Sequence, residues 1–208
     1  MSAVDAEAAL RGHRVIPVYT PVSEDEAVAV ARALSRGGIG AIEVTLRTPK
    51  AIDAIAAIAR DVPEMIVGAG TVLEVAQLHD AQRAGAKFAV SPGSLDDLLA
   101  AARDSGMPYL PGVATGSEVM KSLQAGFRLL KVFPAEAINA RALIAAWQGP
   151  FPQVRFCPTG GIDAERARDY LALPNVACLG GSWLTPKGML ERGDWAHIEV
   201  LARAAARL

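Results

Sequence analysis

Residues 41–60 read AIEVTLRTPKAIDAIAAIAR, and this stretch contains the unit that is repeated along the chain. Residues 42–47 alternate between apolar and polar side chains, which is typical of a strand. After a Thr-Pro pair, apolar residues recur three and four positions apart, which is typical of a helix with one buried face. The stretch therefore predicts one strand followed by one amphipathic helix.

The same unit recurs about every 23 residues. Eight strands are predicted over residues 15–20, 41–46, 66–71, 88–92, 109–113, 129–134, 154–158 and 176–180. Helices are predicted over residues 24–36, 50–60, 75–84, 95–105, 117–124, 140–146, 164–171 and 195–206, with an extra N-terminal helix over 3–11. Eight alternating units favour an α/β fold, the (β/α)8 TIM barrel, in a single domain of residues 1–208. An open doubly wound sheet is the alternative, but the chain has no GxGxxG motif.

Three helix starts carry capping signals. They are Ser23 with Glu26, Thr115 with Glu118, and Thr48 before Pro49. A hydroxyl or carboxylate at such a position accepts hydrogen bonds from backbone N–H groups that the helix itself leaves without partners. We therefore expect these residues to fix where their helices begin.

The composition excludes several classes of protein. The chain has 208 residues, of which 51% are apolar and 21% charged, and its net charge is -1. A near-neutral chain argues against nonspecific binding to nucleic acid or to anionic membranes, and no apolar run is long enough to span a bilayer. The N-terminus lacks a basic start followed by an apolar run, so we expect no signal peptide and a cytoplasmic location. Cys157 and Cys178 have no redox or metal spacing and are predicted to be reduced core residues.

Lys131 carries the clearest catalytic signal. The chain has five lysines, and Lys131 is the one inside a predicted strand, in LLKVFP at 129–134. Because side chains alternate along a strand, Leu129, Lys131 and Phe133 are predicted to face the barrel interior. Burial disfavours the charged form of an amine. A neutral amine is the nucleophile that Schiff-base formation on a ketone requires, although a lysine paired with a carboxylate for structure is the alternative.

Glu43 is the matching acidic residue. It shares the inner face of the second predicted strand with Thr45 and Arg47, while the apolar residues between them face the helices. An unpaired buried carboxylate is costly, so Glu43 needs a partner such as Lys131. It is also placed to transfer protons in catalysis. A structural ion pair and a catalytic pair both agree with this placement.

Two polar residues end the second and third predicted strands. Arg47 lies where a guanidinium could bind a substrate carboxylate with two hydrogen bonds, and a solvated surface arginine is the alternative. Thr71 ends GAGT at 68–71, with Glu74 three residues later. It is therefore predicted to cap the next helix, to face the site, or to do both.

Two glycine-rich segments follow the last two strands. TGG at 159–161 ends the seventh predicted strand, and GGS at 180–182 ends the eighth. In TIM barrels these loops commonly bind phosphate, and glycine lets backbone N–H groups come close to the anion. Plain tight turns are the alternative.

No metal or cofactor is expected. His13, His79 and His197 lie away from the predicted strand ends. No cluster of His, Cys, Asp and Glu has the spacing of metal ligands, which disfavours metal-assisted aldol chemistry.

Five segments, in order along the chain, resemble those of a known family. They are EVTLRT at 43–48, VGAGTV at 67–72, KVFPAE at 131–136, RFCPTGG at 155–161 and GGSWL at 180–184. From about residue 15 to residue 208, the chain resembles the 2-keto-3-deoxy-6-phosphogluconate (KDPG) aldolases, also called 4-hydroxy-2-oxoglutarate aldolases. The resemblance implies a class I, Schiff-base aldolase with a (β/α)8 fold, a keto-acid phosphate substrate and a homotrimeric assembly.

The resemblance also implies roles for individual residues. Lys131 would be the Schiff-base lysine and Glu43 the general acid and base. Arg47 and Thr71 match positions that hold the carboxylate of the pyruvyl group.

Further matches concern the rest of the substrate. Pro92 and Phe133 match apolar walls of the pyruvyl pocket. The region that holds the distal phosphate would contain Thr159, Gly160, Gly161 and Ser182. The segment YTPVS at 19–23 is the least family-like part of the chain, which leaves the preferred aldehyde open.

The implied reaction is the reversible cleavage of KDPG to pyruvate and glyceraldehyde 3-phosphate. Cleavage of 4-hydroxy-2-oxoglutarate to pyruvate and glyoxylate is a second possibility. Two other classes remain as alternatives. Another phosphate-binding barrel enzyme, such as an isomerase or synthase, would share the glycine-rich loops but would not need an interior lysine. A non-catalytic sugar-phosphate binder would bind substrate without turnover.

Overall fold

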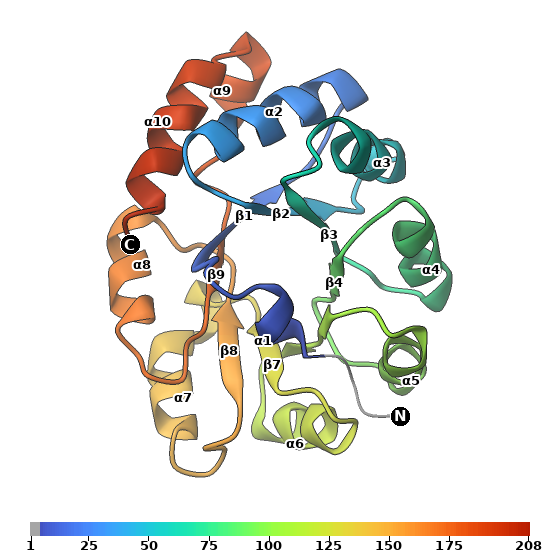
Figure 1. Ribbon diagram of the computed structural model, residues 1–208. Coiled ribbons are helices and arrows are strands. Elements are labelled where there is room, and N and C mark those ends of the chain that lie inside the picture. Colours follow the sequence, from blue (N-terminus) through green and yellow to red (C-terminus); the bar gives the residue numbers. More distant parts are fainter. Residues whose placement is uncertain (1–4) are drawn as a thin grey trace.

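The computed structural model describes residues 5–208, in which parallel strands alternate with helices (Figure 1). The strands are β1 (Val15–Tyr19), β2 (Ala41–Thr45), β3 (Ile66–Gly70), β4 (Phe88–Val90), β5 (Tyr109–Leu110), β6 (Gly112–Val113), β7 (Leu129–Val132), β8 (Arg155–Pro158) and β9 (Leu179–Gly181). The helices are α1 (Ala6–Ala9), α2 (Glu24–Arg36), α3 (Ala51–Asp61), α4 (Val75–Arg83), α5 (Asp96–Ser105), α6 (Gly116–Gln124), α7 (Ala140–Trp147), α8 (Ala164–Leu171), α9 (Lys187–Arg192) and α10 (Trp195–Ala205), with a 3-10 helix η1 (Glu136–Ile138). The chain thus has the alternating order that the repeated unit predicts.

The strands form two parallel sheets, with the orders β5-β4-β3-β2-β1-β9 and β6-β7-β8. Two isolated bridges, Phe156 with Val176 and Thr159 with Gly180, connect the second sheet to the segment around β9. At the other junction, β5 and β6 are separated only by Pro111, which has no N–H group to donate to a sheet. The structure is therefore an α/β fold with curled parallel sheets.

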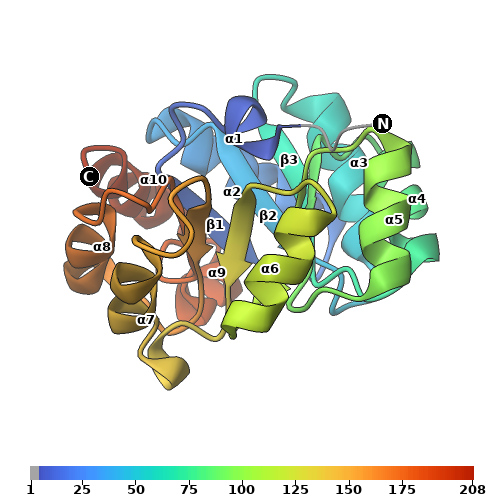
Figure 2. The same ribbon diagram turned by 90° about the horizontal axis from the view of Figure 1, so that it is seen from below.

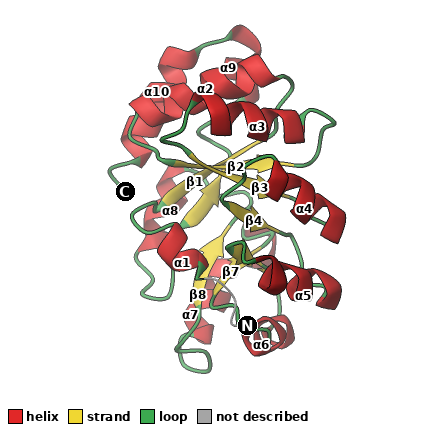
Figure 3. Ribbon diagram, turned by 45° about the vertical axis from the view of Figure 1, so that its right-hand side comes forward, coloured by secondary structure: helices red, strands yellow, loops and turns green. Residues whose placement is uncertain are grey.

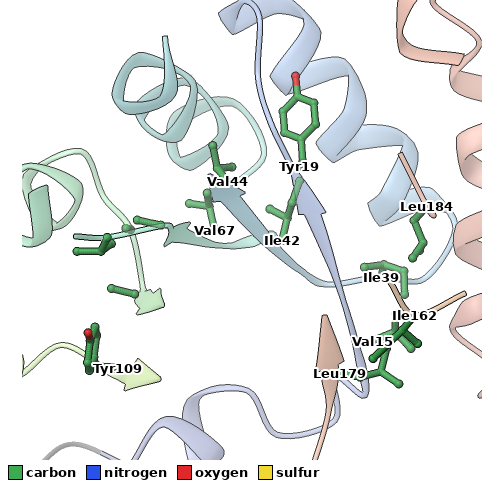
Figure 4. Close-up of a cluster of buried hydrophobic side chains, with 14 of the residues drawn as sticks. Val15, Tyr19, Ile39, Ile42, Val44, Val67, Tyr109, Ile162, Leu179 and Leu184 are labelled. Atoms are coloured by element: carbon green, nitrogen blue, oxygen red, sulfur yellow. The ribbon is translucent and has the colours of Figure 1, made fainter. Parts of the chain in front are cut away.

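The helices lie outside the strands (Figures 2 and 3). Alternate strand residues point toward these helices and are buried with them in one apolar cluster, as Ile42 and Val44 of β2 and Val67 of β3 illustrate (Figure 4). Leu130 and Val132 of β7 belong to the same cluster. The predicted alternation of β2 and β7 is confirmed, so the residues between these apolar positions face the opposite side.

A second apolar cluster fills the interior, mainly toward the N-terminal ends of the strands. It includes Ile16, Leu129, Cys157 and Cys178, together with Leu10 from the turn after α1. Both cysteines are buried and free, as predicted. In Figure 1, α1 lies across this end of the strands. The N-terminal half of the interior is therefore a packed core.

Several predicted boundaries are wrong. The predicted strand 109–113 is split at Pro111 into β5 and β6. The predicted strand 176–180 pairs at Val176 by an isolated bridge and becomes regular only in β9. The N-terminal helix was predicted over 3–11, but α1 is shorter because Asp5 accepts hydrogen bonds from the first N–H groups and Gly12 has φ of 87°. Residues 3 and 4 of that prediction lie outside the described residues. α9 and η1 were not predicted.

The capping predictions had different outcomes. Thr115 and Glu118 form the predicted capping box at α6. Ser23 caps α2 by accepting from the backbone N–H of Glu26, but the Glu26 carboxylate binds the Tyr19 hydroxyl instead of completing the box. Thr48 was predicted to cap α3 but does not.

α3 begins two residues later than the Thr48 signal predicts. The cap position is Lys50, which makes no side-chain cap. The Thr48 hydroxyl instead donates to the carbonyl of Pro21 at 2.8 Å, which fastens the β2–α3 loop to the β1–α2 loop. A tertiary hydrogen bond has therefore replaced the local one.

No helix within residues 5–208 is long and apolar enough to cross a membrane.

Candidate active site

Lys131 and Glu43 meet inside the fold, although they come from different sheets. The Lys131 Nζ lies 3.0 Å from Oε1 and 3.4 Å from Oε2 of Glu43. The two side chains are only 5% and 4% exposed. The sequence predicted both residues to face the interior, and the structure brings them together as a hydrogen-bonded pair.

This pair has a useful electrostatic property. Its total charge is zero whether the proton is on the Lys131 amine or on the Glu43 carboxylate, so transfer along the hydrogen bond leaves no unpaired buried charge. The Phe133 ring lies 5.4 Å from Nζ, where its face stabilises a cation. The site can therefore hold an ammonium and also convert it to a nucleophilic amine.

Gly70 makes room for the carboxylate. A Cβ at this position would overlap Oε1 and the side-chain carbons of Glu43. Gly70 is the residue opposite Thr45 in the β2–β3 ladder, so the missing side chain opens space on the inner face directly above Glu43. Sequence reasoning treated this glycine only as part of a motif, because its role depends on a neighbouring strand.

Arg47 and Thr71 form the next layer toward the carboxyl ends of the strands. The Arg47 Nε donates a hydrogen bond to the Thr71 hydroxyl at 3.2 Å. Thr71 has φ of 58°, in the left-handed region that a β-branched residue rarely adopts. Such outliers cluster at functional sites, where the surrounding structure maintains them.

Thr71 does not cap α4, so that alternative is wrong. The capping box at α4 is formed by Glu74 and Gln77. The Thr71 side chain is directed instead to Arg47. Together, the two residues place a guanidinium and a hydroxyl beside each other at the ends of β2 and β3, where both can donate to a carboxylate.

Thr45 and Thr20 form a hydroxyl pair that sequence reasoning did not assign to the site. Their Oγ1 atoms are 2.8 Å apart, and Thr45 is fully buried. The β1–β2 register pairs Tyr19 with Val44, which places Thr20 beside Thr45. The strand pattern was the available signal, since Thr45 lies between Glu43 and Arg47 on the inner face.

Phe133 and Pro92 lie on either side of Lys131. Phe133 directly follows β7, and a Cβ on Gly160 would lie 3.2 Å from its ring. The backbone of Pro92 fills the space next to Gly112, and Gly112 is the ladder partner of Lys131. These residues therefore line opposite sides of the strand that carries the amine.

The two glycine-rich segments are brought together as predicted. Thr159 is buried and forms a bridge with Gly180, and a Cβ on Gly180 would overlap its hydroxyl. Gly160 and Gly161 have φ of 107° and 79°, a backbone conformation that favours glycine. Ser182 is exposed directly after β9. The segments share one edge of the site, on the side of Phe133.

Within residues 5–208, no group of three or more His, Cys, Asp and Glu side chains is arranged to hold a metal ion. Burial lowers the pKa of His13, which lies between α1 and β1 at the opposite end of the strands.

Comparisons with known proteins agree with this site. The model of the "KDPG and KHG aldolase" family matches residues 6–201. An Escherichia coli "KHG/KDPG aldolase" is 51% identical over 200 residues, which cover 96% of this chain and 94% of the relative. A "2-dehydro-3-deoxy-phosphogluconate aldolase" of Pseudomonas aeruginosa is 47% identical over 195 residues, with 94% and 89% coverage.

A solved structure is also similar along almost its whole length. It is a KDPG aldolase from Legionella pneumophila with pyruvate captured as a covalent carbinolamine intermediate. The identity is 44%, the TM-score is 0.94, and the match covers 97% of this chain and 98% of the other. On the family match, the two relatives and this structure together, the chain belongs to the KDPG and KHG aldolase family.

Proposed function

We propose that this protein is a class I aldolase that reversibly cleaves KDPG to pyruvate and glyceraldehyde 3-phosphate. The observation that carries the proposal is the buried Lys131–Glu43 pair, at 3.0 Å, beside Arg47 and Thr71. An isomerase or synthase with the same glycine-rich loops has no need for an interior lysine. The relatives from Escherichia coli and Pseudomonas aeruginosa, which are named as aldolases of this type, support the assignment.

The first half of the reaction joins the substrate to Lys131. Glu43 takes the proton of the Lys131 ammonium, and the neutral amine attacks the keto carbon. Glu43 then returns a proton to the oxygen of the carbinolamine, which leaves as water and gives a protonated imine. The Legionella relative, in which pyruvate is held as a carbinolamine, supports this step.

The second half breaks the carbon–carbon bond. The Glu43 carboxylate takes the proton of the substrate hydroxyl, the adjacent carbon–carbon bond breaks, and its electron pair moves into the imine to form an enamine. The aldehyde leaves. The enamine then takes a proton at carbon, and water hydrolyses the imine to release pyruvate and restore the Lys131 amine.

The remaining residues bind and orient the substrate. Arg47 and Thr71 hold the carboxylate of the pyruvyl group, and Pro92 and Phe133 form its apolar walls. The distal phosphate binds at the two glycine-rich segments, through Thr159, Gly160, Gly161 and Ser182. The close approach that the glycines allow and the bridge between the segments support this assignment.

A second substrate is 4-hydroxy-2-oxoglutarate, which gives pyruvate and glyoxylate. It uses the same lysine, glutamate and carboxylate-binding residues and makes no demand on the phosphate site. The Escherichia coli relative, which carries both names, supports this extension.

Borohydride trapping with pyruvate tests the proposal. Reduction should fix a pyruvyl group on Lys131, and mass spectrometry of the digested protein should locate it there. Lys131→Ala should abolish both the adduct and turnover, whereas Lys87→Ala, a change at an exposed lysine, should preserve both. Full turnover by Lys131→Ala would contradict the lysine assignment. Binding of KDPG with neither adduct nor turnover would favour a sugar-phosphate binder.

The finer architecture is also a proposal. The bridges at Val176 and Gly180, and the continuity of β5 and β6 across Pro111, support a closed (β/α)8 barrel in a single domain. We further propose a homotrimer, on the basis of the family resemblance. Light scattering should then give about three times the chain mass of 21.7 kDa.

A further inference from the structure

A large cavity lies beside the candidate site, at the carboxyl ends of β1 and β9. Its volume is about 590 Å³, which is within the range of small-molecule pockets. Its apolar lining comes from Val18, Val22 and Leu190. Its hydroxyl groups come from Thr20, Ser182 and Thr185. The proposed reaction gives no role to most of this lining.

The cavity adjoins the site at two points. Thr20 is hydrogen-bonded to Thr45, which shares the inner face of β2 with Glu43. Ser182 belongs to the segment proposed to hold the distal phosphate, and it also lines the cavity. The cavity therefore lies on the side of the site where the aldehyde half of the substrate is placed.

The charges in the cavity do not suit a phosphate. Glu26 accepts a hydrogen bond from the Tyr19 hydroxyl at 2.5 Å, and burial together with Glu26 raises the pKa of Tyr19, so the phenol remains a donor. The Lys187 ammonium lies 3.6 Å from Glu191 and is 89% exposed. Two carboxylates and one ammonium give the lining a net negative charge. An anion would be repelled, and an uncharged molecule would not.

Val22 shows that the cavity has apolar surface to cover. Its side chain is 66% exposed. An aliphatic chain in contact with Val22, Val18 and Leu190 would remove their apolar surface from water.

We propose that this cavity is a binding pocket for the tail of uncharged aliphatic aldehydes, which the enzyme joins to pyruvate. The inference rests on the proposed aldolase function and assigns a further acceptor class to the same catalytic pair. The apolar lining binds the tail, and Thr20 of the lining is hydrogen-bonded to Thr45, which shares the inner face of β2 with Glu43.

The chemistry is the proposed cleavage in reverse, and it balances without a further reactant. Pyruvate and the Lys131 amine form an imine with loss of water, and Glu43 takes a proton from the methyl carbon to give the enamine. That carbon attacks the aldehyde carbon, and the electron pair of the carbonyl goes to its oxygen, which takes a proton from Glu43. Water then hydrolyses the imine and releases a 4-hydroxy-2-keto acid.

The test compares two acceptors, butanal and glyceraldehyde 3-phosphate, each with pyruvate and the full-length protein. Product formation is measured by chromatography and mass spectrometry. The wild type should join both aldehydes to pyruvate. Val22→Ser removes one apolar wall, so kcat/KM for butanal should fall about fivefold relative to that for glyceraldehyde 3-phosphate. Val200→Ser is the matched control, since Val200 is 57% exposed on α10 and lies outside the cavity.

Ser182→Ala gives the opposite selectivity. It removes a proposed phosphate contact but leaves the apolar walls, so it should lower kcat/KM for glyceraldehyde 3-phosphate more than that for butanal. Turnover of glyceraldehyde 3-phosphate without any product from butanal would overturn the pocket and leave the aldolase assignment standing. An unchanged selectivity in Val22→Ser would also overturn it. Failure with both aldehydes would contradict the proposed function itself.

Discussion

The two ends of the strand interior are built in opposite ways. At the N-terminal ends, Leu10, Ile16 and Leu129 pack with the buried thiol of Cys178, and α1 lies across them. At the carboxyl ends, the interior holds a buried ion pair, and glycine takes the place of a larger residue where the carboxylate of Glu43 needs space. One strand, β7, contributes Leu129 to the first end and Lys131 to the second.

The difference shows how a small fold can combine stability with reactivity. Apolar packing at one end contributes free energy of folding in proportion to the buried area. The other end retains a buried pair that contributes little to stability, because its desolvation offsets the attraction. Leu129 and Lys131, two positions apart on β7, belong to the stabilising end and the reactive end. Changes at the first end should therefore alter the free energy of unfolding, and changes at the second should alter kcat.

Glu43→Gln should have the largest effect. An amide cannot accept the proton of the Lys131 ammonium, so we expect kcat for KDPG cleavage to fall by about 10²–10⁴-fold. Exposed Glu165→Gln on α8 should leave kcat unchanged. Steady-state kinetics with both variants measure this. Near-normal turnover in Glu43→Gln would reduce the pair to a structural role.

Gly70→Ala should have the next largest effect on kcat. The added methyl group would overlap the Glu43 carboxylate and displace it from Lys131, and a shift of about 1 Å can cost about 100-fold in rate. Gly149→Ala is the control, because nothing lies within 4 Å of a Cβ there. If kcat of Gly70→Ala stays within twofold of the wild type, the space above Glu43 has no catalytic importance.

Leu129→Ala tests the packed end. Leu129 is buried, so its truncation should lower the free energy of unfolding by about 3 kcal/mol. Urea denaturation measures this loss. At temperatures where the variant is folded, kcat should remain near the wild-type value. A large drop in kcat without a loss of stability would contradict the separation between the two ends.

Cys178→Ala should have the smallest effect, which is a change in how the free energy of unfolding depends on pH. Contact with Cys157 and burial raise the pKa of the Cys178 thiol well above its usual value. The folded state therefore holds this proton after the unfolded chain has lost it, so the stabilisation is complete below about pH 8.5 and declines as the pH rises. Cys178→Ala should remove this decline, at most about 1.4 kcal/mol per pH unit. Urea denaturation of both proteins at several pH values above 8.5 measures this. If the free energies of unfolding of the wild type and of Cys178→Ala change with pH by the same amount, the prediction is wrong.

The features that the sequence predicts correctly are those that follow from the alternation of side chains along a strand and from the repeated strand–helix unit. The alternation around Glu43 and Lys131 predicted which side chains turn inward, because a strand has a fixed period of two. Their meeting followed from the parallel arrangement of consecutive βα units. The pairing of the two glycine-rich segments at Thr159 and Gly180 followed for the same reason.

The unpredicted parts depend on contacts between distant segments. Thr48 has the residue type of a cap, but a hydrogen bond to Pro21 on another loop occupies its hydroxyl. Thr71 has a left-handed backbone that no local pattern favours, and its partner is Arg47 on the neighbouring strand. Gly70 acquires its role only when the Glu43 carboxylate lies against it. In each case the deciding neighbour is far away in sequence.

The position of α1 has a kinetic consequence. Because α1 and the side chains beneath it fill one end of the interior, we expect substrate to reach Lys131 from the carboxyl ends of the strands and both products to leave the same way. In the proposed site, the pyruvyl group would be bound deepest, and the aldehyde would lie between it and the solvent. We therefore expect ordered release, with the aldehyde first. In initial-rate experiments pyruvate should compete with KDPG, whereas glyceraldehyde 3-phosphate should inhibit noncompetitively. The four-residue helix α1, at the N-terminal ends of the strands, would thus determine the order in which products leave at the carboxyl ends.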